Sequence, residues 1–201
     1  MRTKRFFLFL FFCFSPAIKT HAQLLDSLSL DTVYTYHSIE EGLKQPDMVF
    51  KLSLRKKKLK TFPMEILRFK NLQYLDLSKN QLEELPPKIS ELLYLQYLSL
   101  SRNKLITLPA AIGRLKNLKR LIVNQNDIGY LPKEIGESEN LEYLDLWSNE
   151  ISDLPEDIKN LKKLRLLDMR VILINNTQQK IIEELLPETK IYFSPSCNCG
   201  K

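Results

Sequence analysis

The sequence predicts an α/β solenoid, in which a curved parallel sheet is backed by short helical or irregular return segments and closed by a cap at each end. Two observations predict it. The line "LDLSKNQLEELP" at residues 75–86 recurs with a step of 23 residues at 98–109, 121–132 and 144–155. Half of the ten prolines share one phase of this step: Pro63, Pro86, Pro109, Pro132 and Pro155.

Each unit begins with a short strand, as in "YLDLS". Successive side chains of a strand point to opposite faces, so Leu75 and Leu77 face one side and Tyr74, Asp76 and Ser78 face the other. A single strand of this kind cannot bury its leucines. Stacked neighbours can bury them, and the strands then form a parallel sheet with the leucines inside.

The segment after each strand carries an asparagine at a fixed phase: Asn80, Asn103, Asn126 and Asn149. An amide has both a donor and an acceptor, so it can satisfy turn backbone that would otherwise be buried without a partner. We expect these residues to be structural and not catalytic. On the return side, "LPPKISEL" spaces Leu85, Ile89 and Leu92 so that one helical turn faces the core, with the proline at or before its first turn.

The complete unit is LxxLxLxxNxLxxLPxxIxxLxx, and in this pattern the chain resembles the leucine-rich repeat family. It is most similar to the 23-residue subclass with "LPxxIxxL" on the convex side, which includes Ras-suppressor-type repeats, plant Ras-group-related repeats and short secreted bacterial proteins. The resemblance covers residues 49 to about 193. It implies the architecture of a leucine-rich repeat solenoid, but it does not identify a ligand.

Both ends of such an array need covers. At the front, "HSIEEGLKQP" places Ser38 and Glu41 at capping-box spacing, which predicts a short helix that stops at Pro46 and covers Leu52 and Leu54. At the C-terminal end, Ile172 occupies the asparagine position of the sixth repeat. A helical apolar stripe and a last strand at 190–193 then follow; the stripe comprises Ile181, Ile182, Leu185 and Leu186.

The first residues combine a basic start, an apolar run at 6–14 and the small residue Ala22, which is typical of a secretory signal peptide. The apolar run is too short to span a bilayer. We therefore expect export after cleavage at Ala22, to the periplasm, the surface or the medium. The expected divisions are 1–22 signal peptide, 23–48 N-terminal cap, 49–171 about six repeats, 172–194 C-terminal cap helix and strand, and 195–201 flexible tail.

Charge gives no general reason to expect nucleic-acid binding. Four of the 30 basic residues and no acidic residue lie in residues 1–22, so the net charge falls from +6 to +2 after cleavage. The stretch "RKKKLK" at 55–60 could contact phosphate, an acidic glycan or a membrane surface. The preferred interpretation is a solvated loop on a degenerate first repeat, in which Lys57 occupies the asparagine phase.

Residues for metal or catalytic chemistry are scarce. Cys197 and Cys199 can form a strained bridge, bridge to another chain, or remain free thiols, and together with His37 they supply too few ligands for a metal site. No glycine-rich phosphate loop occurs among the five glycines, and the acids are scattered. We expect no cofactor and no enzyme. The alternatives are a binding module and a self-associating envelope or surface protein.

The expected binding face is the concave side of the sheet, which carries the strand residues that the core does not use. Tyr, Trp and Arg are the residue types that most often anchor interfaces. The candidate contacts to an unknown protein or peptide are Tyr74, Tyr97, Arg120, Asn124, Tyr143, Asp145, Trp147 and Arg170. For Tyr74 and Tyr97, an alternative is that the rings pack against each other along the sheet.

Overall fold

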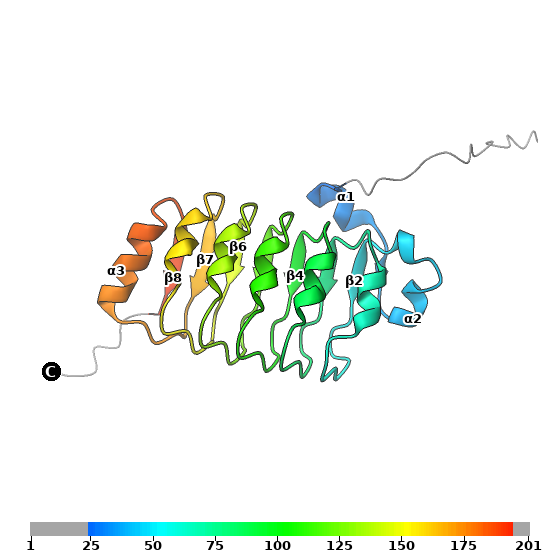
Figure 1. Cartoon of the computed structure of the whole chain (residues 1–201), viewed down its shortest axis with the longest axis horizontal. Coiled ribbons are helices and arrows are strands. Elements are labelled where there is room, and N and C mark those ends of the chain that lie inside the picture. Colours follow the sequence, from blue (N-terminus) through cyan, green and yellow to red (C-terminus); the bar gives the residue numbers. More distant parts are fainter. Residues whose placement is uncertain (1–23, 195–201) are drawn as a thin grey trace, which may run out of the picture.

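Eight parallel strands follow one another in sequence order in one curved sheet (Figure 1). The computed structural model describes residues 24–194. The strands are β1 Thr35–Tyr36, β2 Lys51–Ser53, β3 Tyr74–Asp76, β4 Tyr97–Ser99, β5 Arg120–Ile122, β6 Tyr143–Asp145, β7 Leu166–Met169 and β8 Lys190–Phe193. The leucine-rich repeat solenoid that the 23-residue period predicts is therefore confirmed.

The register of the sheet keeps equivalent residues of successive repeats side by side. The central leucine of each strand pairs with that of the next, in the order Leu52, Leu75, Leu98, Leu121, Leu144 and Leu167. All six are completely buried in a single hydrophobic core. Side chains that share a phase of the repeat therefore form straight columns across the sheet, as the alternation of strand side chains requires.

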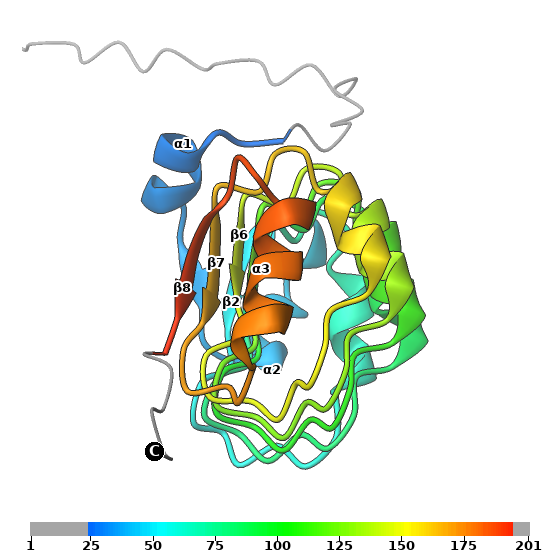
Figure 2. The same cartoon turned by 90° about the vertical axis from the view of Figure 1, so that its left-hand side faces the viewer.

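The return segments form the convex layer opposite the sheet (Figure 2). They are 3-10 helices: η2 Met64–Arg68, η3 Pro87–Glu91, η4 Ala110–Arg114, η5 Lys133–Glu137 and η6 Glu156–Asn160. A proline at the N-cap of each one fixes φ near the helical value and directs the chain into the turn. The isoleucine of each helix is completely buried, so the convex layer closes the core as the sequence spacing predicts.

The N-terminal cap comprises helix α1 Ser27–Thr32, strand β1, helix α2 Ile39–Gly42 and the 3-10 turn η1 Pro46–Met48. The predicted cap of α2 is present, since the Ser38 hydroxyl accepts a hydrogen bond from the Glu41 backbone N–H at 3.1 Å. A Cβ at Gly42 would lie 2.9 Å from the Phe69 ring, so α2 packs closely on the same core that contains Leu52 and Leu54. Helix α1 and strand β1 were not predicted.

The C-terminal cap comprises helix α3 Asn176–Leu185 and strand β8. Asn175 and Gln178 form a capping box at the start of α3. Ile182 and Leu186 are buried, but the predicted apolar stripe is wrong at Ile181, which is 48% exposed. The helix turns only one edge toward the last repeat, so Ile181 points to solvent.

Two predicted segments, the signal peptide at 1–22 and the tail that contains Cys197 and Cys199, lie outside the described residues. Within residues 24–194, no helix combines the length and the apolar character needed to cross a bilayer.

Candidate functional site

The four asparagines lie at the inner side of the turns and join consecutive repeats. The Asn103 Oδ1 accepts from the Leu82 backbone N–H at 3.0 Å, and its Nδ2 donates to the carbonyl oxygens of Leu100 at 2.8 Å and Leu77 at 3.1 Å. Asn80, Asn126 and Asn149 make the corresponding bonds. Each amide thus satisfies backbone groups of its own repeat and of the preceding one, which is a structural role.

The first column of the concave face contains two stacked rings. The rings of Tyr74 and Tyr97 are 4.2 Å apart and inclined by 8°. Burial raises the pKa of both hydroxyl groups. The two residues therefore pack against each other along the sheet, and each keeps only part of its surface accessible on the concave side.

Cations flank these rings in the same column. The Lys51 Nζ lies 5.2 Å from the centre of the Tyr74 ring, and the Arg120 guanidinium lies 6.0 Å from that of Tyr97 and 4.7 Å from that of Tyr143. These distances are those of cation–π contacts. We call the five residues of this column on strands β2 to β6 the tyrosine row: Lys51, Tyr74, Tyr97, Arg120 and Tyr143. Arg120 is its exposed member, held between two rings.

The second column carries carboxylates that are almost completely buried. The exposed fractions of Asp76, Asp145 and Asp168 are 8%, 7% and 4%. In each case Oδ1 accepts a backbone N–H two residues later, at 2.9 to 3.1 Å. These bonds fix the end of each strand. The expectation that the Asp145 carboxylate is available to a ligand is therefore corrected.

Asn124 provides the second hydrogen bond to Asp145. Its Nδ2 donates to Oδ2 of that carboxylate, so both oxygens are occupied within the sheet. Burial raises the pKa of Asp145, and the hydrogen bond from Asn124 opposes this effect. Asn124 is partly exposed and retains surface on the concave side.

The third column contains Trp147 and Arg170. Trp147 is half-buried, whereas Arg170 is exposed and makes a bidentate ion pair with Asp168, with Nη2 to Oδ2 at 2.6 Å and Nε to Oδ1 at 3.0 Å. The Arg170 guanidinium also lies 5.5 Å from the ring of Tyr192 in β8. Tyr192 is a concave-face residue that sequence reasoning missed, because the 23-residue step from Asp168 leads to Ile191, whereas the register pairs Asp168 with Tyr192.

The exposed charges of the concave face have one sign. Strand residues Arg120 and Lys190 are exposed cations, as are Arg55 and Arg170 at the strand ends. The acids of the same face are the buried, bonded aspartates of the second column. The accessible surface therefore presents cations and aromatic rings, and its carboxylates are buried and hydrogen-bonded within the sheet.

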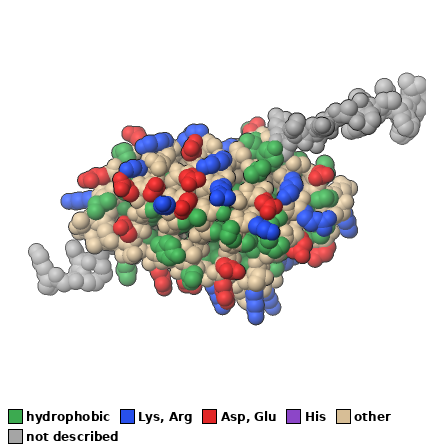
Figure 3. Space-filling model, viewed as in Figure 1, with side chains coloured by type: hydrophobic (Ala, Val, Ile, Leu, Met, Phe, Trp, Pro, Cys, Tyr) green, Lys and Arg blue, Asp and Glu red, His purple; other side chains and the backbone are tan. Residues whose placement is uncertain are grey.

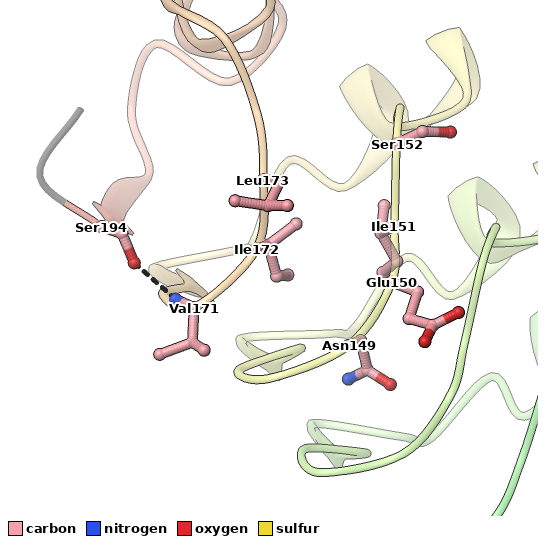
Figure 4. Close-up of a pocket in the computed structure, with 8 residues that line it drawn as sticks. All are labelled: Asn149, Glu150, Ile151, Ser152, Val171, Ile172, Leu173 and Ser194. Atoms are coloured by element: carbon pink, nitrogen blue, oxygen red, sulfur yellow. Dashed lines mark hydrogen bonds between the residues drawn. The ribbon is translucent and has the colours of Figure 1, made fainter. Parts of the chain in front are cut away.

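A pocket of about 790 Å³ lies apart from the concave face, between the last repeat and the C-terminal cap (Figure 4). Its apolar lining comes from Ile151, Val171, Ile172 and Leu173, and Leu173 is 97% exposed. The backbone N–H of Val171 donates to the Ser194 hydroxyl across its rim. Within residues 24–194, no three His, Cys, Asp or Glu side chains lie close enough together to hold a metal ion.

Comparison with known families gives two matches. The family described as "Leucine-rich repeat region" matches residues 88–186, and the family described as "Leucine Rich Repeat" matches residues 71–92. No curated protein sequence matches the chain.

Solved structures of repeat proteins are similar to this one. A leucine-rich repeat protein of Leptospira interrogans has a TM-score of 0.65 and 32% identity, over 81% of this chain and 49% of its own. Internalin C2 of Listeria monocytogenes has a TM-score of 0.64 and 21% identity, over 76% and 64% of the two chains. This last likeness concerns the fold alone.

The third structure is the leucine-rich repeat ectodomain of the plant membrane receptor kinase GASSHO1/SCHENGEN3 from Arabidopsis thaliana, in complex with CASPARIAN STRIP INTEGRITY FACTOR 2. Its TM-score is 0.56 with 27% identity, over 64% of this chain and 16% of that one. This chain thus spans about half of the Leptospira protein and a small part of the plant receptor.

Proposed function

Because this chain belongs to the leucine-rich repeat family, we propose that it is a non-catalytic module that binds a protein or peptide across its concave face. Arrays of this kind commonly use the concave surface for binding. The observation that carries the proposal is the exposed Arg120 between two tyrosine rings, on a face that the core does not need and that also carries Trp147 just after strand β6. These residue types are enriched among the anchors of protein interfaces.

The dimensions of the face suit such a ligand. Strands are about 4.8 Å apart, so the six strands β2 to β7 make a strip roughly 25 Å long. A strip of that length accommodates an extended peptide or the edge of a protein domain. The Arabidopsis ectodomain, which shares the fold, was solved in complex with a factor named in its description, and this supports the proposal by analogy.

A second candidate function is self-association, which the apolar rim at the C-terminal end favours. Leu173 is 97% exposed and Val171 is 60% exposed, and both line the pocket beside the cap. Exposed apolar patches of this kind mark contact sites in many proteins. Light scattering over a range of protein concentrations distinguishes the two functions, since a concave-face module remains at the mass of one chain.

We also propose that residues 1–22 direct export, on the strength of the basic start, the apolar run and Ala22. N-terminal sequencing of the protein from its native host then finds Gln23 as the first residue. Retention of Met1 contradicts export by this route.

Affinity capture from the native culture tests the binding face. The double variant Tyr143→Ala/Trp147→Ala is expected to weaken binding of the captured partner by about 2 kcal/mol or more, because it removes two aromatic anchors. A thermal melt checks that this variant remains folded. The matched control Lys88→Ala/Glu134→Ala changes the convex side, where Lys88 and Glu134 lie in η3 and η5. Unchanged binding by the concave variant and loss by the convex one contradict the proposal.

A further inference from the structure

Three neighbouring turns each hold a cation at the same phase of the repeat. Lys56, Lys79 and Arg102 follow strands β2, β3 and β4, and all three have left-handed backbone, with φ of 59°, 57° and 55°. The turns are stacked by backbone hydrogen bonds, from Lys56 N–H to the Ser78 oxygen at 3.1 Å and from Lys79 N–H to the Ser101 oxygen at 2.8 Å. The three cations therefore form a row with a spacing of about one strand, roughly 4.8 Å.

Further cations from the first turn widen this row. Arg55, Lys57 and Lys58 are exposed, and Arg55 donates from Nη1 to the Ser78 hydroxyl, which places its side chain along the second turn. Figure 3 shows Lys and Arg side chains that project from the lower edge of the molecule. We call the set the basic edge; it comprises Arg55, Lys56, Lys57, Lys58, Lys79 and Arg102.

The side chains of the basic edge are not engaged in ion pairs within the described part of the chain. None of its six side chains forms an ion pair with a carboxylate of residues 24–194. The proximity of Arg102 is the main cause of a lowered pKa at Lys79, with burial, Arg55 and Lys56 adding to the effect. The cations thus repel one another in the free protein, and an anionic partner relieves this repulsion.

Turn geometry alone does not require these cations. The later repeats adopt the same left-handed conformation at this phase with the uncharged residues Gln125, Ser148 and Val171. The charge is therefore a property of the first three repeats and is separate from the fold. Sequence inspection alone revealed only "RKKKLK", because Lys79 and Arg102 join it through the stacking of turns 23 residues apart.

The basic edge is continuous with the concave face. Arg55 directly follows Ser53 and Leu54 at the end of β2, and Lys51 at its start belongs to the tyrosine row. The acid of the adjacent strand, Asp76, is buried and bonded to the backbone. None of the large exposed apolar side chains belongs to these three turns, so this surface has nothing to insert into a lipid bilayer.

We propose that the partner is an acidic polypeptide, in which a segment rich in Asp and Glu crosses the basic edge while the adjoining part occupies the concave face. This inference rests on the proposed function and adds the chemical class and the orientation of the partner. The acidic segment lies over the first three repeats, and the contacts with Tyr143 and Trp147 lie toward the C-terminal end.

The test uses a fluorescent peptide made only of Asp and Glu, together with its Asn and Gln counterpart. Fluorescence anisotropy at an ionic strength of about 0.15 M measures binding to the full chain. The variant Lys56→Gln/Lys79→Gln/Arg102→Gln keeps the turn, since Gln125 adopts the same conformation with φ 53°. We expect the wild-type protein to bind the acidic peptide and ignore the neutral one, and the variant to bind about tenfold more weakly.

The matched control Lys88→Gln/Lys133→Gln/Lys162→Gln removes the same charge from exposed convex positions and is expected to leave binding within about twofold. Equal losses in the two variants, or no binding by the wild-type protein, overturn the inference. Binding of phosphatidylglycerol vesicles without binding of the peptide overturns it in favour of a membrane surface. The proposed concave-face function is tested separately, by the Tyr143→Ala/Trp147→Ala variant and its captured partner. If the protein captures a partner but does not bind the acidic peptide, only the inference of an acidic partner is overturned.

Discussion

The Asn103 Nδ2 donates to the carbonyl oxygen of Leu77, which lies 26 residues earlier in the chain, at 3.1 Å. Leu77 closes the strand segment of the preceding repeat, so one side chain connects the turn of its own unit to the core of the unit before it. The Oδ1 of the same amide accepts from Leu82, also in the preceding repeat. Stability in this fold therefore depends on bonds between units as well as within them.

Replacing Asn103 by Ala is expected to cost on the order of 1 to 3 kcal/mol of unfolding free energy, because buried backbone groups lose their partners. Urea melts at neutral pH measure the loss. The control is Lys57→Ala at the same phase of the first repeat, where the exposed side chain makes no hydrogen bond within the described residues and only the backbone N–H contacts Asn80. Equal losses at the two positions contradict the structural role.

Gly113 permits close contact between two neighbouring return helices. A Cβ at this position would lie 2.0 Å from the carbonyl oxygen of Glu134, which is backbone that cannot easily move. Gly113→Ala is therefore expected to lower the unfolding free energy by about 2 to 3 kcal/mol. Gly129→Ala is the matched control, since a Cβ there meets no atom within 4 Å. Thermal melts that show no difference between the two variants contradict this packing.

Asp145 gives a pH dependence whose sign can be derived. Burial raises its pKa above the usual 3.8, so the folded state binds more protons than the unfolded state as pH rises from that value through the raised pKa. The free energy of unfolding therefore falls as the pH rises across this window, and the ionised Asp145 carboxylate destabilises the folded state at neutral pH. Asp145→Asn keeps an oxygen for the Trp147 N–H, and a flip of the Asn124 amide presents its oxygen to the new amide nitrogen, so the variant is expected to unfold at higher urea than the wild type at neutral pH.

This advantage of Asp145→Asn is expected to shrink as the pH falls toward and below the usual value of a carboxyl group, where the unfolded state is protonated too. The exposed Glu139→Gln serves as the control, because it removes the same charge from the surface. A wild-type protein that is more stable than Asp145→Asn at neutral pH contradicts the assignment of burial as the dominant effect.

Val171 is strained at the end of the repeat array. Its φ is 57°, a left-handed conformation that a β-branched side chain adopts at a cost, and 60% of the residue is exposed. Val171→Asn is expected to raise the unfolding free energy by about 1 kcal/mol, because Asn tolerates this conformation and little packing is lost. Calorimetry checks the gain. Ser148→Asn at the same phase, with no β-branch to relieve, is expected to gain less.

Much of the fold followed from one period in the sequence. The leucine columns and the buried isoleucines of the convex side lie where the 23-residue step predicts them. The last strand lies at 190–193, as its own residues predict, but its register with β7 is 24 residues and not 23. Strand β1 escaped prediction because Thr35–Tyr36 has no leucine pattern, and its pairing with Lys51 and Leu52 depends on the open edge of β2. Helix α1 is similar: the adjacent backbone of Leu25 is fixed by side chains of distant repeats, Gln73 and Gln96.

The candidate site was harder to predict than the fold. Alternation along a strand gives the direction of a side chain but not its depth, so the burial of Asp145 required the positions of Asn124 and of the turn backbone. The stacking of Tyr74 on Tyr97 was one of two possibilities at the level of sequence, and the geometry of the rings decides for contact between them.

Each strand in the sheet bonds only to the strands immediately before and after it in sequence. A gene duplication that adds one complete unit between β4 and β5 therefore inserts one new strand. The new unit pairs with β4 on one side and β5 on the other, and it offers each of them the same backbone hydrogen bonds, core leucine and asparagine amide that they offered each other before. The concave strip lengthens by about 4.8 Å and both caps remain as they were. Over evolutionary time, the length of the concave strip is thus adjustable in whole-unit steps without any redesign of the core.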